Sequence, residues 1–271
     1  MTILYFDCFS GAAGDMILGA LLDAGLPISE LRRALGSLAI GPDAIWAERV
    51  TRAGVSATKF HVRGERAPID HAHDHDQEHG VVDLSHHAAP GHEHDDVRHH
   101  GAHRSLEEID ALIDGSALSA TGKDRAKGLF AKLGAAEAAI HETSIDEVHL
   151  HEVGALDSII DIVGTVYALE AFGADRILAS PLNVGSGSVY SAHGMYPVPA
   201  PATTRLLEGV PIYAGPQKAE LVTPTGALLI TAYAEAFGVV PPMRLHRAGY
   251  GAGSRDFPLA PNVLRVLIGE G

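Results

Sequence analysis

The sequence predicts an α/β protein, in which a mixed β-sheet is flanked by helices and interrupted by a disordered His-rich insert. Three observations predict this class. Stretches rich in β-formers alternate with stretches of helical period over most of the chain. Hydrophobic residues make up 46% of the 271 residues, which is enough for a buried core. Over residues 67–104 the periodicity disappears, and His, Asp, Gly and Ala dominate.

Residues 1–66 are expected to form the first part of the α/β core. A strand is predicted over 3–9, followed by a tight turn and a helix that Gly25 and Pro27 stop. A second helix is predicted over 29–38, with Ser29 as its N-cap. Residues 45–50 and 59–63 are predicted to pair as strands across Gly54.

Residues 105–271 are expected to form the remainder of the core. Ser105 followed by Glu108 is a capping-box pattern that opens a short helix. Further elements follow from periodicity and turn signals. Helices are predicted over 119–141, over 158–172, from 197–202 onward and over 227–237; strands are predicted over 176–183 and 262–268; and a flexible turn is predicted over 185–188.

Charge and composition exclude several classes of function. The formal net charge of −14, without a basic cluster, argues against binding of nucleic acid and favours attraction of cations. No run of 18 apolar residues predicts a membrane span, and the N-terminus lacks the basic region of a signal peptide. A single cysteine, Cys8, is consistent with a reducing compartment. We therefore expect a cytoplasmic protein.

Histidines are concentrated in the insert. Eleven of the 17 lie between His71 and His103, interleaved with carboxylates. Imidazole suits nickel, copper, zinc and cobalt, so the segment is expected to capture such ions at low specificity. Its clearest candidate ligands are His71, His73, His75, His92 and His94. The alternative is a solvated polar linker of biased composition.

A second group of candidate metal ligands lies in one short stretch. His149, His151 and Glu152 precede a predicted helix that carries Asp157 and Asp161. On a strand the two histidines would point to the same face, and on a helix the two aspartates would lie one turn apart. Acids at the start of an apolar helix are costly to bury without partners. The alternative is structural: Asp157 caps the helix, Asp161 makes a buried hydrogen bond, and the histidines are half exposed.

Three glycine-rich turns are candidates for binding an anionic small ligand. Two of them precede helices, whose first amides and dipole favour phosphate or carboxylate. None matches the P-loop pattern, and simple turn chemistry is the alternative for each. The candidate ligand-binding residues in these turns are Ser10, Gly11, Gly14, Gly185, Ser186, Gly187, Thr223, Thr225 and Gly226. Asp7 ends the first strand, where α/β proteins place ligands, whereas its neighbour Cys8 is expected to point away.

Three stretches together resemble a known family. They are residues 7–16, residues 149–158, and residues 197–202 with 223–227. They are similar to the nickel-insertion proteins of the nickel-pincer cofactor pathway, the LarC family, and the resemblance covers nearly the whole chain outside the insert.

The resemblance implies a chemistry. Such proteins place nickel into pyridinium-3,5-bisthiocarboxylic acid mononucleotide to make the cofactor of lactate racemase, as CTP-dependent enzymes with manganese as companion ion. Asp7 or Asp15 would then assist removal of the ring proton that a carbon–nickel bond displaces. Full-length members continue into a C-terminal domain linked to CTP binding, so the resemblance implies that this chain corresponds to their N-terminal part. The expected partners are therefore the mononucleotide and a C-terminal companion domain or chain, with the protein itself as a homo-oligomer.

Two alternatives to a nickel chelatase stay open. The His-rich insert also suits a nickel store or metallochaperone without chemistry of its own. A metal-dependent hydrolase would use the same cluster to activate water, although no hydrolase motif supports it. Zinc or cobalt would fit the same ligands.

Overall fold

The structure is a computed structural model that describes residues 1–38, 40–41, 43–63, 104–145, 156–191 and 194–271. Its centre is a seven-stranded mixed sheet with the order β2-β3-β10-β11-β1-β4-β9. The central strand β1 runs antiparallel to β11 and parallel to β4. The sheet strands are β1 (Thr2–Asp7), β2 (Ile45–Arg52), β3 (Val55–Val62), β4 (Arg176–Ala179), β9 (Ala236–Phe237), β10 (Arg244–Ala252) and β11 (Val263–Glu270).

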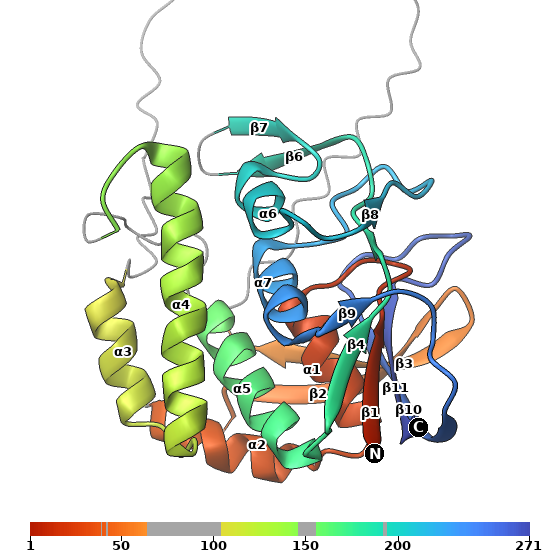
Figure 1. Ribbon diagram of the computed structural model, residues 1–271, viewed down its shortest axis with the longest axis horizontal. Coiled ribbons are helices and arrows are strands. Elements are labelled where there is room, and N and C mark those ends of the chain that lie inside the picture. The colour runs from red at the N-terminus through yellow and green to blue at the C-terminus, as the bar shows by residue number, and fades with distance from the viewer. Residues whose placement is uncertain (39, 42, 64–103, 146–155, 192–193) are drawn as a thin grey trace, which may run out of the picture.

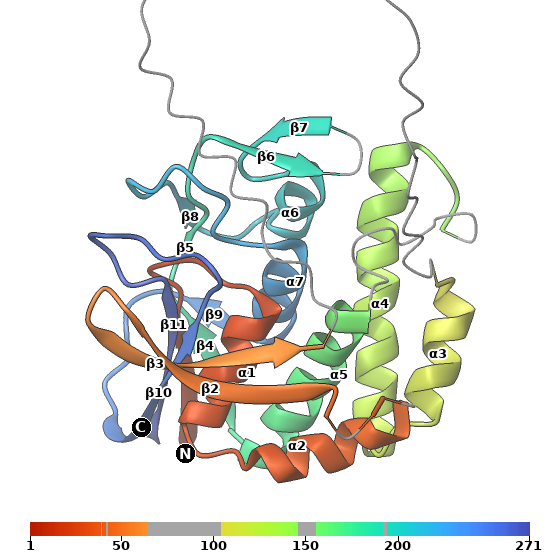
Figure 2. The same ribbon diagram turned by 180° about the vertical axis from the view of Figure 1, so that it is seen from behind.

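Helices gather on one side of this sheet (Figures 1 and 2). They are α1 (Gly14–Asp23), α2 (Ile28–Leu35), α3 (Leu106–Asp114), α4 (Ala120–His141), α5 (Leu156–Phe172), α6 (Pro201–Leu206) and α7 (Pro224–Tyr233), with a short 3-10 helix at Gly36–Leu38. Helix α1 packs directly on β3, β10 and β11, α5 packs on α1, and α4 and α3 follow outward. The predicted mixed sheet flanked by helices is therefore confirmed.

Strand β1 shows how the sequence divides the core between the two faces of the sheet. Leu4 and Phe6 are buried in the main core with the helices, whereas Ile3 and Tyr5 are buried on the opposite face in a smaller cluster. This alternation is the two-residue period of a strand. The phenol of Tyr5 donates a hydrogen bond to the Gly238 carbonyl at 2.9 Å, so the chain that follows β9 helps to cover the second face.

The N-terminal residues of three helices were predicted from local sequence signals, with different success. The predicted capping box of α3 is present, with Ser105 and Glu108 each bonded to the other's backbone. The prediction of Ser29 as an N-cap is wrong, because α2 begins at Ile28 and its N-cap is Pro27. Helix α7 begins at Pro224, three residues before the prediction, because Thr223 caps it.

The strand predictions differ from the structure in two places. Residues 176–183 form two strands, because β4 ends before the Ser180–Pro181 pair and β5 (Leu182–Asn183) pairs instead with β8 (Ile212–Tyr213). Residues 185–188 lead into a hairpin of β6 (Ser188–Ser191) and β7 (Gly194–Pro197).

Strand β10 was not predicted, because glycines interrupt its β-forming pattern. These glycines serve the packing of α1 on the sheet. A side chain at Gly249 would lie 2.6 Å from the Ala24 amide, and one at Gly251 would lie 2.5 Å from the Ala20 amide. Helix α1 therefore lies unusually close to β10, which fixes the position of its N-terminus. Within the described residues, no helix is long and apolar enough to cross a membrane.

Candidate functional site

Two of the three glycine turns pack against each other: the turn that contains Gly11 and the turn that contains Gly226. The Ala12 amide donates to the Leu221 carbonyl at 2.9 Å, and the Thr223 amide donates back to the Ala12 carbonyl at 3.1 Å. Gly11 has a φ of +87°, and any side chain there would overlap Leu221. A side chain at Gly226 would overlap Ala12 in the same way. The glycines at these positions therefore permit close backbone approach.

The third glycine turn, which contains Gly185 and Ser186, contacts the chain that leads into Thr223. The Gly185 amide donates to Asn183 Oδ1 at 3.1 Å, and the Ser186 amide donates to the Ala219 carbonyl at 3.2 Å. The Ser186 hydroxyl donates to the Gln217 carbonyl at 3.0 Å. Residues 217–223 thus connect all three turns, a relationship that the sequence did not reveal.

Six amides of these turns are bonded within the protein and are therefore not free for a ligand. The amides of Gly11, Ala12, Gly185, Ser186, Thr223 and Gly226 are donated within the protein. A buried backbone amide is normally paired, and here neighbouring turns supply the acceptors. The Thr223 hydroxyl accepts from Gly226, Thr225 is buried, and the buried Ser10 hydroxyl has no hydrogen-bond partner among the described residues. Binding of a mononucleotide by these turns, including Gly14 and Gly187, stays a prediction.

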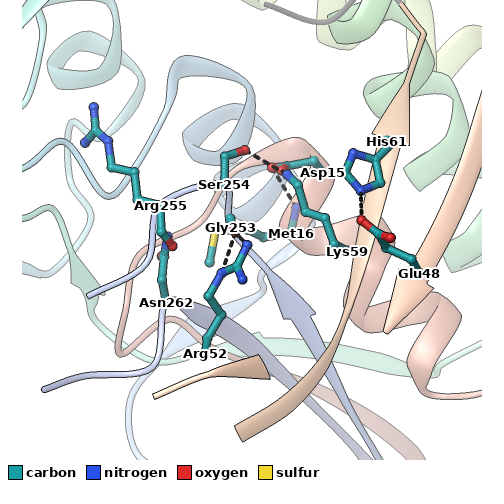
Figure 3. A network of polar contacts seen from close by, with 10 residues as sticks. All are labelled: Asp15, Met16, Glu48, Arg52, Lys59, His61, Gly253, Ser254, Arg255 and Asn262. Carbon is teal, nitrogen blue, oxygen red and sulfur yellow. Dashed lines mark hydrogen bonds and ion pairs between the residues drawn. The ribbon is translucent and has the colours of Figure 1, made fainter. Parts of the chain in front are cut away.

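The N-terminus of α1 carries a buried ion pair that the sequence analysis missed. Asp15, the second residue of the helix, pairs with Lys59 on β3, whose side chain is only 4% exposed. The Lys59 ammonium also donates to the Ser254 hydroxyl at 2.8 Å (Figure 3). The other Asp15 oxygen accepts a hydrogen bond from the Met16 amide at 2.8 Å. A lysine within a strand gives no sequence signal for such a pair, because its usual position is solvated.

Two aspartates of α5 lie beside this helix start. Asp157 is the second residue of α5, and Asp161 lies one turn farther on, as predicted. A side chain at Gly14 would lie 2.6 Å from the Asp161 Cβ atom, so Asp161 packs directly against the first residue of α1. Acidic residues gather here around a helix N-terminus, whose dipole favours negative charge.

The carboxyl of Asp157 has an unusual environment. Burial raises its pKa above the ordinary value, and the charge of Asp15 raises this pKa further, against the lowering effect of a hydrogen bond from the Ser158 amide. That bond is 2.9 Å long. Among the residues that the structure describes, Asp157 has no cationic partner. A cation bound at this carboxylate would therefore relieve the unfavourable energy of burying its charge.

The remaining predicted metal ligands lie outside the described residues. They are His149, His151 and Glu152, and His71, His73, His75, His92 and His94 of the insert. Within the described parts of the chain, no three His, Cys, Asp or Glu side chains are grouped to hold a metal ion. In the sequence, Asp157 lies five positions after Glu152.

Asp7 lies at the end of β1, as predicted, and pairs with a residue that the sequence analysis did not select. Arg265 on β11 donates to Asp7 through Nε at 3.0 Å and also through Nη2. The next residue, Cys8, is fully buried. Burial raises the pKa of its thiol, and the charge of Asp7 adds to this effect. Cys8 is therefore a core residue.

Comparisons with known proteins now assign the family. Residues 4–271 match the model of the family described as nickel insertion protein. The chain is 43% identical over 270 residues to the pyridinium-3,5-bisthiocarboxylic acid mononucleotide nickel insertion proteins of Desulfitobacterium hafniense and Geobacillus kaustophilus. It is 43% identical over 272 residues to a putative nickel insertion protein of Geotalea daltonii.

These alignments cover 100% of the chain but 59%, 60% and 61% of the three relatives, so the chain spans about three fifths of their length. No solved structure matches the chain. The family model and the identity over the whole chain agree with the resemblance carried by residues 7–16 and 149–158. The chain belongs to the nickel insertion protein family.

Proposed function

We propose that this chain inserts nickel into pyridinium-3,5-bisthiocarboxylic acid mononucleotide, as a nickel chelatase of the lyase class. The substrate is the one for which its relatives are named. The single observation on this chain that carries the proposal is the pair Asp157 and Asp161, which is packed beside the start of α1 and directly follows the segment with His149 and His151.

In this proposal nickel is cargo and is held only transiently. His149, His151 and Glu152 receive the ion, and Asp157 or Asp161 lies in contact with it or with its ligands. Imidazole and carboxylate together suit nickel. The histidines of the insert collect the ion before transfer.

Asp7 and Asp15 are the candidate acceptors for the ring proton that leaves when the carbon–nickel bond forms. Each is ion-paired in the structure, Asp7 with Arg265 and Asp15 with Lys59. Comparison of Asp7→Asn with Asp15→Asn would separate them, because only the true acceptor is needed for the proton-transfer step.

We also propose that the reaction depends on CTP and manganese and that the chain acts with a C-terminal companion domain or chain. The amides of Gly11, Ala12, Gly185, Ser186, Thr223 and Gly226 are already donated within the protein and are not free to hold a triphosphate. No step is therefore assigned to CTP or manganese here. We further propose that the protein forms a homo-oligomer and is located in the cytoplasm.

The test compares two matched pairs of substitutions in the full chain. His149→Ala with His151→Ala removes a His-x-His pair at the proposed site, and His71→Ala with His73→Ala removes one of equal spacing from the insert. The first pair is expected to abolish nickel transfer to the mononucleotide, and the second is expected to leave transfer intact. Full transfer after the first change would overturn the assignment.

A nickel store without chemistry is the second candidate, and the dense histidines of the insert favour it. Calorimetry on a chain lacking residues 70–103, with and without the mononucleotide, distinguishes the two. A remaining one-to-one nickel site that tightens with the mononucleotide supports insertion. Loss of all nickel binding supports storage.

A further inference from the structure

A cavity of about 390 Å³ lies at the end of α1 that is opposite to Asp15. It is formed where α1 ends, α2 begins and α5 ends; α2 and the end of α5 lie at the lower edge of the molecule in Figure 1. The ten residues of α1 span about 15 Å, so the cavity is separate from the proposed nickel site. Small-molecule sites have volumes of roughly 300–1,000 Å³, and this cavity lies at the lower end of that range.

Part of the cavity wall is apolar. Leu26 and Ile268 are buried, and Phe172 is partly buried against the main core. Contact with such a wall removes the hydrocarbon surface of a ligand from water, which favours binding. The wall therefore suits a ligand with an apolar part.

A β-bulge in β10 directs two consecutive residues to the cavity. Leu245 pairs with Gly269 and Arg247 pairs with Ile268, so His246 is an extra residue between two adjacent pairs. Successive side chains of a regular strand point to opposite faces, yet His246 and Arg247 both line the cavity. Bulges are frequent next to active sites, where they redirect a side chain. The bulge thus adds a second polar side chain to the wall.

The turn after α1 leaves room for the Arg247 guanidinium. Gly25 has a φ of +113°, and a side chain there would lie 3.3 Å from Arg247 Nη1. The Gly25 amide donates to the Leu22 carbonyl at 3.0 Å. The Leu26 amide donates to the Leu21 carbonyl at 3.1 Å, which completes the turn. The guanidinium therefore lies against a backbone whose amides are already paired.

Arg247 differs from two other arginines of the sheet in having no anionic partner. Arg49 pairs with Asp23, and Arg265 pairs with Asp7. The Arg247 side chain has no hydrogen bond or ion pair with the residues that the structure describes. In a chain with a net charge of −14, its planar set of N–H donors is thus available to an anion.

Glu30 also lines the cavity and limits the charge of the ligand. It forms no ion pair with Arg247 in the described part of the chain. Its carboxylate repels negative charge, so a ligand with a single acid group fits the cavity better than a polyphosphate does.

We propose that this cavity binds a small organic anion, whose single carboxylate or phosphate group is held by Arg247 and whose apolar part contacts Leu26 and Phe172. The site does not depend on the proposed nickel chemistry, because it shares no residue with it. The bulge at His246 and the glycine turn at Gly25 are the two backbone features that build it.

The test is an NMR titration of the isotope-labelled full chain with four probes. Benzoate and phenyl phosphate carry both a ring and an acid group, whereas inorganic phosphate and benzyl alcohol each carry one of these parts. Both aryl anions are expected to shift the Gly25 and Phe172 amide signals saturably. The partial probes are expected to bind at least roughly tenfold more weakly, because each makes only part of the contacts. Tighter binding of benzoate would identify a carboxylate ligand, and tighter binding of phenyl phosphate a phosphate ligand.

Substitutions then test the two charged residues of the cavity. Arg247→Met is expected to weaken benzoate binding by roughly tenfold, because a charge-assisted hydrogen bond is lost. Arg247→Lys is expected to weaken it less, because lysine keeps the charge without the planar group. Glu30→Gln is expected to tighten benzoate binding by about threefold, because a repelling charge is removed.

Arg244→Met is the matched control. Arg244 is exposed at the start of β10, does not line the cavity, and its loss makes the same change in net charge. Its benzoate binding is expected to equal that of the parent chain. Arg247 is exposed as well, so its variants are expected to fold, and urea unfolding of each variant records this. The proposal would be overturned by equal benzoate binding in Arg247→Met and Arg244→Met, by benzyl alcohol binding as tightly as benzoate, or by no saturable shift with either aryl anion.

Discussion

Asp15 and Asp157 occupy the same position in two neighbouring helices. Each is the second residue of its helix, and each accepts a hydrogen bond from the amide of the next residue, at 2.8 Å and 2.9 Å. Lys59 pairs with Asp15, whereas Asp157 is partly buried and has no cationic partner among the described residues. Burial therefore disfavours the charged form of Asp157 and raises its pKa.

The first prediction concerns the stability of the metal-free chain as a function of pH. The folded pKa of Asp157 is raised, so between the ordinary carboxyl pKa of about 4 and the raised value the folded chain binds more protons than the unfolded chain. The contribution of Asp157 to stability therefore falls as pH rises through this window. Asp157→Asn removes the loss, and we expect it to be more stable than the parent at neutral pH.

Urea unfolding of both chains at a series of pH values checks this. The difference between them is expected to shrink toward low pH, where the Asp157 carboxyl of the parent is protonated in both the folded and the unfolded chain. Asp114→Asn is the control, because Asp114 is an exposed acid that pairs with Lys127. A parent chain more stable than Asp157→Asn at neutral pH would contradict the prediction.

The second prediction concerns the contact between α1 and α5. Gly14→Ala places a methyl group against the Asp161 carboxylate, with 2.6 Å between the two Cβ atoms. We expect a loss of about 1–3 kcal/mol in the free energy of unfolding, as is typical of overpacking. We also expect nickel to stabilise the folded chain less, because Asp161 must move.

Gly128→Ala is the matched control for this change. Gly128 lies on the exposed side of α4, and nothing lies within 4 Å of a side chain placed there. Alanine favours a helix over glycine, so this variant is expected to gain up to about 1 kcal/mol. Equal effects at the two glycines would show that Asp161 does not pack as described.

The third prediction concerns Cys8. The thiolate is the reactive form, and burial raises the pKa of the Cys8 thiol. We expect no alkylation of the native chain by iodoacetamide at neutral pH, and alkylation of one thiol per chain after unfolding, since the sequence contains one cysteine. Mass spectrometry measures both states. Rapid labelling of the folded chain would contradict burial of Cys8.

The fourth prediction concerns the ion pair between Asp7 and Arg265. Arg265→Met leaves the Asp7 carboxylate, 15% exposed, without its guanidinium partner. We expect a loss of about 1–3 kcal/mol, because a partly buried charge is left unpaired. Asp7→Asn with Arg265→Met is expected to recover part of this loss, which a double-mutant cycle measures. Additive effects would show that the two residues do not interact.

The sequence by itself determined the elements whose signals are local. The capping box of Ser105 and Glu108, the alternation along β1 and the one-turn spacing of Asp157 and Asp161 each depend on residues within a few positions. Backbone geometry and hydrophobic period fix such features wherever the segment lies. The family resemblance was also available from sequence, because its motifs are contiguous.

Tertiary structure alone decided how these elements meet. The glycines of β10 and of the three turns interrupt local patterns, and their reason appears only when α1 lies on β10 and residues 217–223 join the turns. Lys59 and Asp15 are 44 positions apart, and no local rule pairs them. The energy of a buried charge depends on which distant groups surround it, so the contrast between Asp15 and Asp157 exists only in the folded chain.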